Sequence, residues 1–82
     1  MSEDKVQNIV EYLDEMKNDS TVPRNVKSKM DEVILILNDE LDLSMRIDKA
    51  VHIFDKLNDD VNIDSFTRTQ LWNVVSLIEA LE

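Results

Sequence analysis

The chain nearly repeats itself after 41 residues, and this repeat constrains the fold more than any other feature of the sequence. Twelve positions match in chemical type at that single offset, without a gap. The matched pairs include Leu13 with Phe54 and Val33 with Val74. A repeat of this kind is typical of one supersecondary unit made twice, in which each copy covers the apolar face of the other. We therefore expect two similar halves that fold against each other.

The absence of glycine narrows the choice of secondary structure. The 82 residues contain no glycine and a single proline, Pro23. Two-residue β-hairpin turns need positive φ angles, which glycine supplies, so such hairpins are nearly excluded. Glycine-rich phosphate-binding loops are excluded for the same reason. Helices joined by short polar turns tolerate this composition, because Asn and Asp also adopt the left-handed conformation at helix ends.

Apolar residues recur at helical spacing in four segments of the chain. The first segment runs from about residue 3 to residue 17, with apolar positions at i, i+3, i+4, i+7 and i+10 from Val6. The second begins near Val22, and Pro23 suits a first helical turn. Its apolar stripe extends to Leu41. The third segment follows Asp42. The fourth begins near residue 64 and runs almost to the end of the sequence.

Asp42 is predicted to cap the third helix, and the fourth is predicted to start near Asp64. Short polar connections are expected where consecutive helices pack antiparallel. The sequence therefore predicts a single all-α domain over residues 1–82, a four-helix up-and-down bundle built from two similar helical hairpins. A side-by-side stack of the two hairpins is the alternative, but two units are fewer than the three that solenoids usually need.

Charge and apolar content bear on location and partners. The net charge is −9, of which residues 1–41 carry −5 and residues 42–82 carry −4. This field opposes binding to nucleic-acid backbones and to anionic membranes. The longest apolar run, residues 33–37, is far too short to span a membrane, and no secretory signal is visible. With no cysteine in the chain, we expect a cytoplasmic protein.

Metal-binding and catalytic patterns are weak. The segment from Asp60 to Asp64 matches the first positions of a calcium loop, but Ser65 and Leu71 stand where that loop needs glycine and glutamate. We interpret the segment as a polar turn followed by a helix N-cap. The only histidine, His52, lacks the Glu-x-x-His spacing of bundle metal sites. We therefore expect no enzyme, metal or cofactor, and a metal-dependent enzyme with an acidic cleft is the disfavoured alternative.

Arginines mark the starts of three predicted helices. Arg24 and Arg68 lie near the starts of the second and fourth helices, which share one end of an up-and-down bundle, whereas Arg46 lies at the other end. Together with Lys27, Arg24 and Arg68 form a candidate anion-binding surface, which we call the basic rim. The structural alternative, which we favour, is that each arginine binds a carboxylate of a nearby loop, for example that of Asp60.

The remaining candidate residues are apolar. Leu35, Ile36 and Leu77 exceed what one buried stripe needs, and the only tryptophan, Trp72, either anchors a partner or covers the core edge. Our preferred function is therefore a non-catalytic protein–protein interaction module, with the basic rim and Trp72 as candidate partner-binding residues. An accessory protein that docks on RNA or the ribosome through the basic rim is one alternative, and a homodimer is another.

Three segments of the chain resemble a known family. They are Ser20-Thr21-Val22-Pro23-Arg24-Asn25-Val26-Lys27, Asp42-Leu43-Ser44-Met45-Arg46 and Thr67-Arg68-Thr69-Gln70-Leu71-Trp72-Asn73-Val74-Val75-Ser76. They are similar to small archaeal proteins of uncharacterised protein family one-four-seven, and the similarity covers nearly the whole chain. The resemblance implies a compact four-helix protein of bromodomain-like topology and no assigned activity. The chain departs from the family pattern at Asp60 and Asp64, where prolines are frequent.

Overall fold

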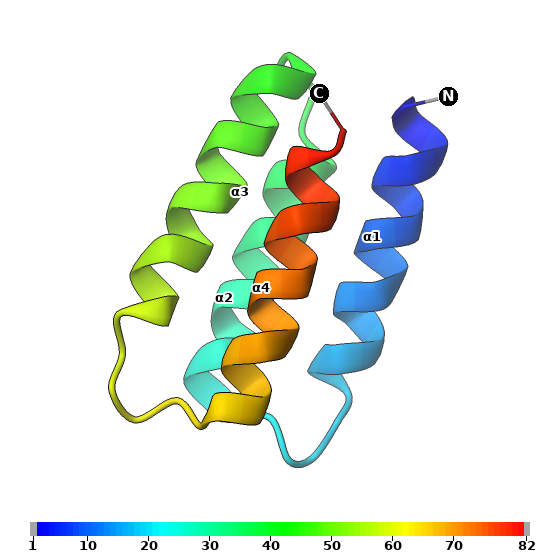
Figure 1. Ribbon diagram of the computed structural model, residues 1–82. Coiled ribbons are helices and arrows are strands. Elements are labelled where there is room, and N and C mark those ends of the chain that lie inside the picture. Colours follow the sequence, from blue (N-terminus) through cyan, green and yellow to red (C-terminus); the bar gives the residue numbers. More distant parts are fainter. Residues whose placement is uncertain (1, 82) are drawn as a thin grey trace.

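The protein is a closed bundle of four helices. The computed structural model describes residues 2–81, with the side chain of Ser2 excepted. The helices are α1 (Ser2–Lys17), α2 (Arg24–Leu37), α3 (Leu43–Asn58) and α4 (Ser65–Glu79). Consecutive helices run antiparallel, so that α1 begins and α4 ends at the same end of the bundle (Figure 1). Among the described residues, none of the helices is long and apolar enough to cross a membrane.

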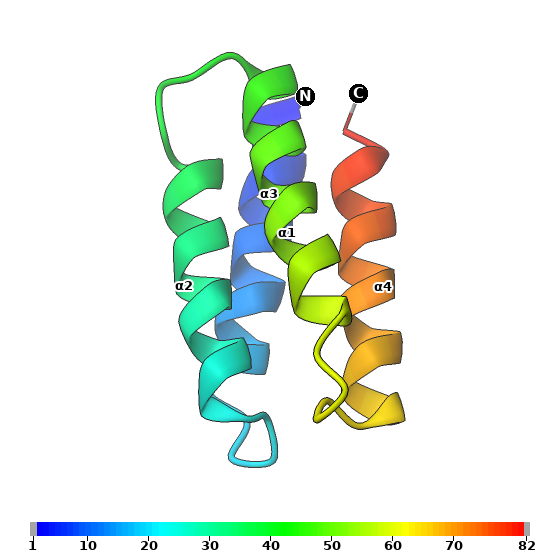
Figure 2. The same cartoon turned by 90° about the vertical axis from the view of Figure 1, so that its left-hand side faces the viewer.

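The helices are arranged as a ring. Each helix packs against the next along the chain, and α4 packs against α1 to close the ring. Figures 1 and 2 show α3 on the opposite side of the bundle from α1 and the two hairpins facing each other. This arrangement confirms the predicted up-and-down bundle, and the alternative of two hairpins stacked side by side is wrong.

The 41-residue repeat is visible in the packing. It relates α1 to α3 and α2 to α4, which corresponds to an approximate twofold axis along the bundle. At the centre of the bundle, equivalent side chains are equally buried: Leu13 and Phe54 are both 0% exposed, as are Val33 and Val74. All four belong to one core. The duplication therefore builds a shared core to which each hairpin contributes in the same way.

The two turns within the hairpins use the same hydrogen bonds. In the first turn Asp19 Oδ1 accepts from the backbone N–H of Thr21 at 2.9 Å. In the second turn Asp60 Oδ1 accepts from the backbone N–H of Asn62 at 2.9 Å. Such Asx turns reverse the chain without positive φ angles. No described residue has a positive φ angle. They explain how the chain turns without glycine.

The helix ends differ from the predicted ones in two places. Pro23 precedes α2 as its N-cap and does not lie in the first turn; its carbonyl accepts the first helical bond, from Lys27 N–H. Leu41 is half-buried in the loop, because α2 has already ended. Asp64 is confirmed as the N-cap of α4, with its carboxylate accepting from a backbone N–H. Asp42 is the N-cap of α3, but its side chain makes no capping bond.

Candidate functional site

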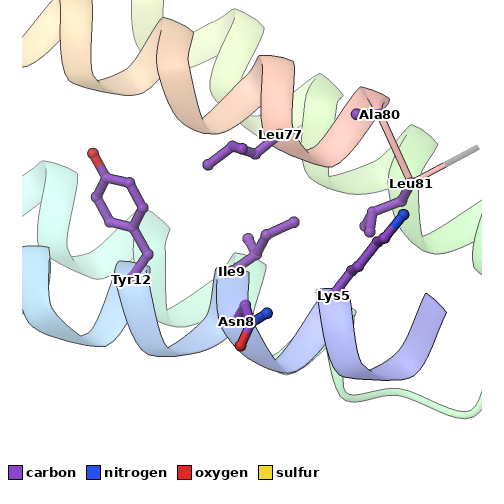
Figure 3. Close-up of a pocket in the computed structure, with 7 residues that line it drawn as sticks. All are labelled: Lys5, Asn8, Ile9, Tyr12, Leu77, Ala80 and Leu81. Atoms are coloured by element: carbon purple, nitrogen blue, oxygen red, sulfur yellow. The ribbon is translucent and has the colours of Figure 1, made fainter. Parts of the chain in front are cut away.

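The least closed seam of the bundle lies between α1 and α4. Of the four neighbouring helix pairs, this pair makes the least extensive contact. A groove of about 380 Å³ runs along the seam. Its lining residues come from α1 and from the C-terminal end of the α4 segment, and they are Lys5, Asn8, Ile9, Tyr12, Leu77, Ala80 and Leu81. Figure 3 shows Tyr12 and Leu77 extending from facing sides of the groove, above Ile9.

The seam related to it by the repeat, between α2 and α3, is the most extensively packed of the four. Arg46 helps to close it. This side chain is 7% exposed, and its Nη1 donates to the backbone carbonyl of Leu37 at 2.8 Å. Its two terminal nitrogens also donate to the carboxylate of Glu3, at 3.3 and 3.2 Å. Arg46 therefore ties the start of α3 to the end of α2 and the start of α1.

At the α1/α4 seam, the residues in the positions equivalent to Arg46 and Ile36 do not close the gap between the helices. Lys5 stands 41 residues before Arg46, and it is exposed at one end of the groove beside Leu81 (Figure 3). Leu77 stands 41 residues after Ile36. Ile36 is half-buried, whereas Leu77 is 43% exposed. The groove therefore lies where the two halves of the repeat differ.

The two walls of the groove differ in charge. On α1, Asp4, Glu11 and Glu15 are exposed and lie at helical spacing from Asn8, so they form one ridge next to Tyr12. On the outer side of α4, the corresponding ridge is uncharged, since it consists of Thr69, Asn73 and Ser76. Lys5 also lines the groove, at its end beside Leu81, so the α1 side carries three acidic side chains and one basic one. The site is thus an apolar groove with a net acidic wall on α1 and a neutral wall on α4.

Arg68 of the basic rim has a structural role. Its Nη1 donates to the carbonyl of Asn58, and its Nη2 donates to the carbonyls of Asp60 at 3.0 Å and Ile63 at 3.5 Å. These bonds satisfy carbonyls at the end of α3 and hold the turn before α4. The predicted tie between Arg68 and the loop is confirmed, but the prediction of a carboxylate acceptor is wrong, because Asp60 accepts through its backbone carbonyl.

The other basic-rim residues lie at the same end of the bundle, where α2 and α4 begin (Figure 1). Arg24 is exposed and Lys27 is half-buried. Hydrogen bonds from the backbone and side chain of Thr21 lower the pKa of Asp19, and the positive charge of Lys27 adds a smaller effect in the same direction. Lys27 thus contributes to the charge balance of the first turn.

Trp72 is 60% exposed on α4, and Leu35 is 72% exposed on α2. Leu77 follows Trp72 by five positions, which places the two on different sides of the helix. Trp72 does not line the groove. Sequence reasoning identified Leu77 but missed Tyr12 and Lys5. The signal that points to them is the mismatch between repeat-equivalent residues, above all Lys5 against Arg46.

The polar residues considered as metal ligands have other roles. Asp60 uses one carboxylate oxygen within its turn and the other to accept from Asn25 Nδ2 at 3.1 Å. Asp64 caps α4, and hydrogen bonds from Thr67 lower its pKa. The interpretation as a polar turn and an N-cap is therefore confirmed. In the part of the chain that the structure describes, no three His, Asp or Glu side chains gather as a metal site, and His52 is exposed.

Comparison with known proteins places this chain in a wider group. The model of the Uncharacterised protein family (UPF0147) matches residues 1–81. A UPF0147 protein of Metallosphaera sedula is 35% identical and covers 98% of this chain and 91% of its own length. One of Methanocaldococcus jannaschii is 33% identical, over 98% of this chain and 87% of its own length.

A solved structure shares the fold. The crystal structure of a protein of unknown function, MMP1188, superposes with a TM-score of 0.87 at 38% sequence identity. The match covers 96% of this chain and 91% of that chain. At this identity and coverage, the four-helix arrangement extends beyond this single protein.

Proposed function

This chain belongs to the uncharacterised protein family UPF0147, and we propose that it works as a non-catalytic module that binds another protein. The binding surface in this proposal is the α1/α4 groove. The main support for this proposal is a difference in packing between two helix pairs, α2/α3 and α1/α4, that occupy equivalent positions in the repeat. The α2/α3 seam is closed by packing and by Arg46, whereas the α1/α4 seam exposes apolar side chains along a concave surface.

The physical argument concerns Leu77 and its surroundings. An exposed apolar side chain in isolation is normal on a protein surface. Here Leu77 faces Tyr12 across the groove and Ile9 forms part of its floor (Figure 3). Apolar surface that is gathered in a concave site and bordered by polar residues is typical of a protein-interaction surface. A partner that fills the groove would remove this surface from water.

Photo-cross-linking in the native host tests the proposal. A photoreactive benzoylphenylalanine replaces Tyr12 in one variant and Leu35 in the control, which is exposed on α2 and does not line the groove. We expect a discrete cross-linked product from position 12 and not from position 35. Recovery of only the uncross-linked monomer from position 12, at low and high salt, would argue against a binding partner.

The alternatives stay predictions with their own tests. Docking on RNA through the basic rim predicts salt-dependent binding in an RNA titration. Arg68 already donates to three backbone carbonyls, and the net charge is −9, so we disfavour this alternative. If the protein is a metal-dependent enzyme, the purified native protein should contain bound metal, and divalent ions should raise its melting temperature.

A further inference from the structure

We propose that the occupant of the α1/α4 groove is an amphipathic helix of the partner, with basic side chains along one edge of its apolar stripe. This inference rests on the proposed function and specifies the partner's chemistry. Its basis is the combination of an apolar floor, an acidic wall and an uncharged wall in one groove.

The dimensions of the groove suit a helix. On α1 the lining extends from Lys5 to Tyr12, which is about two helical turns or roughly 10 Å. A helix laid along this seam presents apolar side chains at i and i+3 or i+4 on one face. One such side chain fits between Tyr12 and Leu77, and a second fits toward Leu81 (Figure 3). The partner helix would then pack against α1 and α4 as the helices of the bundle pack against each other.

The charges beside the groove determine which side chains are favoured along the edges of the partner helix. Asp4, Glu11 and Glu15 flank the lining residues on the α1 side, and all three are exposed. Lys5 lines the same side at the end beside Leu81, so this wall is net acidic and most acidic toward Tyr12. Lysine or arginine side chains on the facing edge of the partner are attracted to this wall, which speeds association and fixes orientation. The α4 side offers the uncharged side chains of Asn73 and Ser76, so the other edge of the partner helix is expected to be polar and neutral.

The same charges argue against a second copy of this chain as the occupant. Each copy carries a net charge of −9, spread over both halves. In a dimer through this groove, the acidic wall of α1 meets another strongly acidic molecule. Like charges facing each other across an interface disfavour association. A basic partner gains from this field, whereas a second copy is opposed by it.

A designed peptide panel tests the inference on the full chain. The probe is a helical peptide of about 16 residues with a leucine stripe, lysines along one edge and glutamines along the other. A matched peptide carries glutamate in place of lysine. Binding is measured by calorimetry, and the site is mapped by backbone amide shifts. We expect the lysine peptide to bind, with the largest shifts in residues 5–12 and 77–81, and the glutamate peptide to bind much more weakly.

Variants of the protein separate specific binding from general attraction. Leu77→Gln should weaken the lysine peptide about tenfold, because a central apolar contact is lost. Leu35→Gln, a matched change on the other exposed leucine, should change the affinity by less than about twofold. Glu11→Lys should weaken the binding and reduce its salt dependence. A thermal melt of each variant confirms that the fold is retained.

Three results would overturn the inference: shifts that map outside the α1/α4 seam, equal losses from Leu77→Gln and Leu35→Gln, or equal binding of both peptides. A dimer in sedimentation that is dissociated by Leu77→Gln would instead make the second copy the occupant. These failures are distinct from failure of the proposed function. A cross-link from position 12 together with a negative peptide panel means that the groove binds a partner of different chemistry.

Discussion

Replacement of Arg46 tests how the α2/α3 seam is closed. The side chain is almost fully buried, and its Nη1 donates to the buried carbonyl of Leu37 at 2.8 Å. Its other hydrogen bonds reach Glu3, whose side chain is 69% exposed. The structure therefore separates one buried charged hydrogen bond from one part-buried ion pair, in which only the carboxylate reaches solvent. These two interactions should contribute very differently to the free energy of unfolding.

The expected magnitudes follow from this separation. Loss of a hydrogen bond from a charged donor costs about 1.5–3 kcal/mol, and the carbonyl left behind stays unpaired. Arg46→Ala also removes the packed stem of the side chain, so we expect about 3 kcal/mol in total. Glu3→Ala removes the part-buried ion pair but leaves the bond to Leu37, so it should cost about 1 kcal/mol. Arg46→Met keeps most of the buried volume and should fall between the two.

Urea unfolding followed by circular dichroism measures these differences. For a domain of this size, about 3 kcal/mol corresponds to a fall of roughly 15 °C in melting temperature. The Glu3→Ala effect should shrink as salt is added, whereas the Arg46→Ala effect should persist. If Arg46→Met is as stable as the original protein, the bond to Leu37 contributes nothing net. That outcome is known for some buried charges that apolar residues replace, and it would refute our reasoning.

Three further predictions follow from the repeat and from the hydrogen bonds of the turns. Val33→Ala and Val74→Ala each remove two methyl groups from fully buried, equivalent positions, so each should lower the free energy of unfolding by about 2 kcal/mol, with similar values in urea titrations; a large difference between them would contradict equivalent packing. Hydrogen bonds from Thr67 lower the pKa of Asp64 below its ordinary value of 3.8 in the folded protein, so its contribution to stability is present above that value and is lost as the pH falls through the lowered pKa. Asp64→Asn keeps a capping side chain without a titrating group, so it should be less sensitive to acid in urea midpoints measured between about pH 6 and pH 2; an unchanged acid profile would contradict this. Arg68→Ala should lower the melting temperature, because carbonyls at the end of α3 lose their donor, whereas Arg24→Ala at an exposed position should leave it nearly unchanged; equal effects would contradict the structural role of Arg68.

The bundle could be predicted from the sequence because it depends on local periodicity. The apolar stripes repeat at helical spacing, and the offset of 41 residues places each stripe in both halves. Burial of Val33 and Val74 follows from these two patterns alone. The ends of the helices depend on individual residues and were predicted less well. The apolar stripe reaches Leu41, but α2 ends at Leu37, where the N–H of Asn38 makes the last helical bonds.

Contacts between distant residues could not be predicted in this way. Arg46 stands in a first helical turn, and nothing near it in the sequence points to Glu3, which is 43 residues away. The width of the α1/α4 seam is a similar case. Periodicity shows which side chains are apolar, but not how closely two helices approach when no loop joins them.

The difference between the two seams has a covalent cause as well as a chemical one. Residues 38–42 connect α2 to α3 and hold those helices together at one end, where Arg46 adds its bonds. Within residues 2–81 no loop joins α4 to α1, so in this part of the chain side chains hold that seam. The same apolar side chains that stabilise it, Tyr12 and Leu77 among them, are therefore available to a partner helix. Such a helix would supply at the α1/α4 seam the contacts that the loop and Arg46 supply at its counterpart, without any rearrangement of the core.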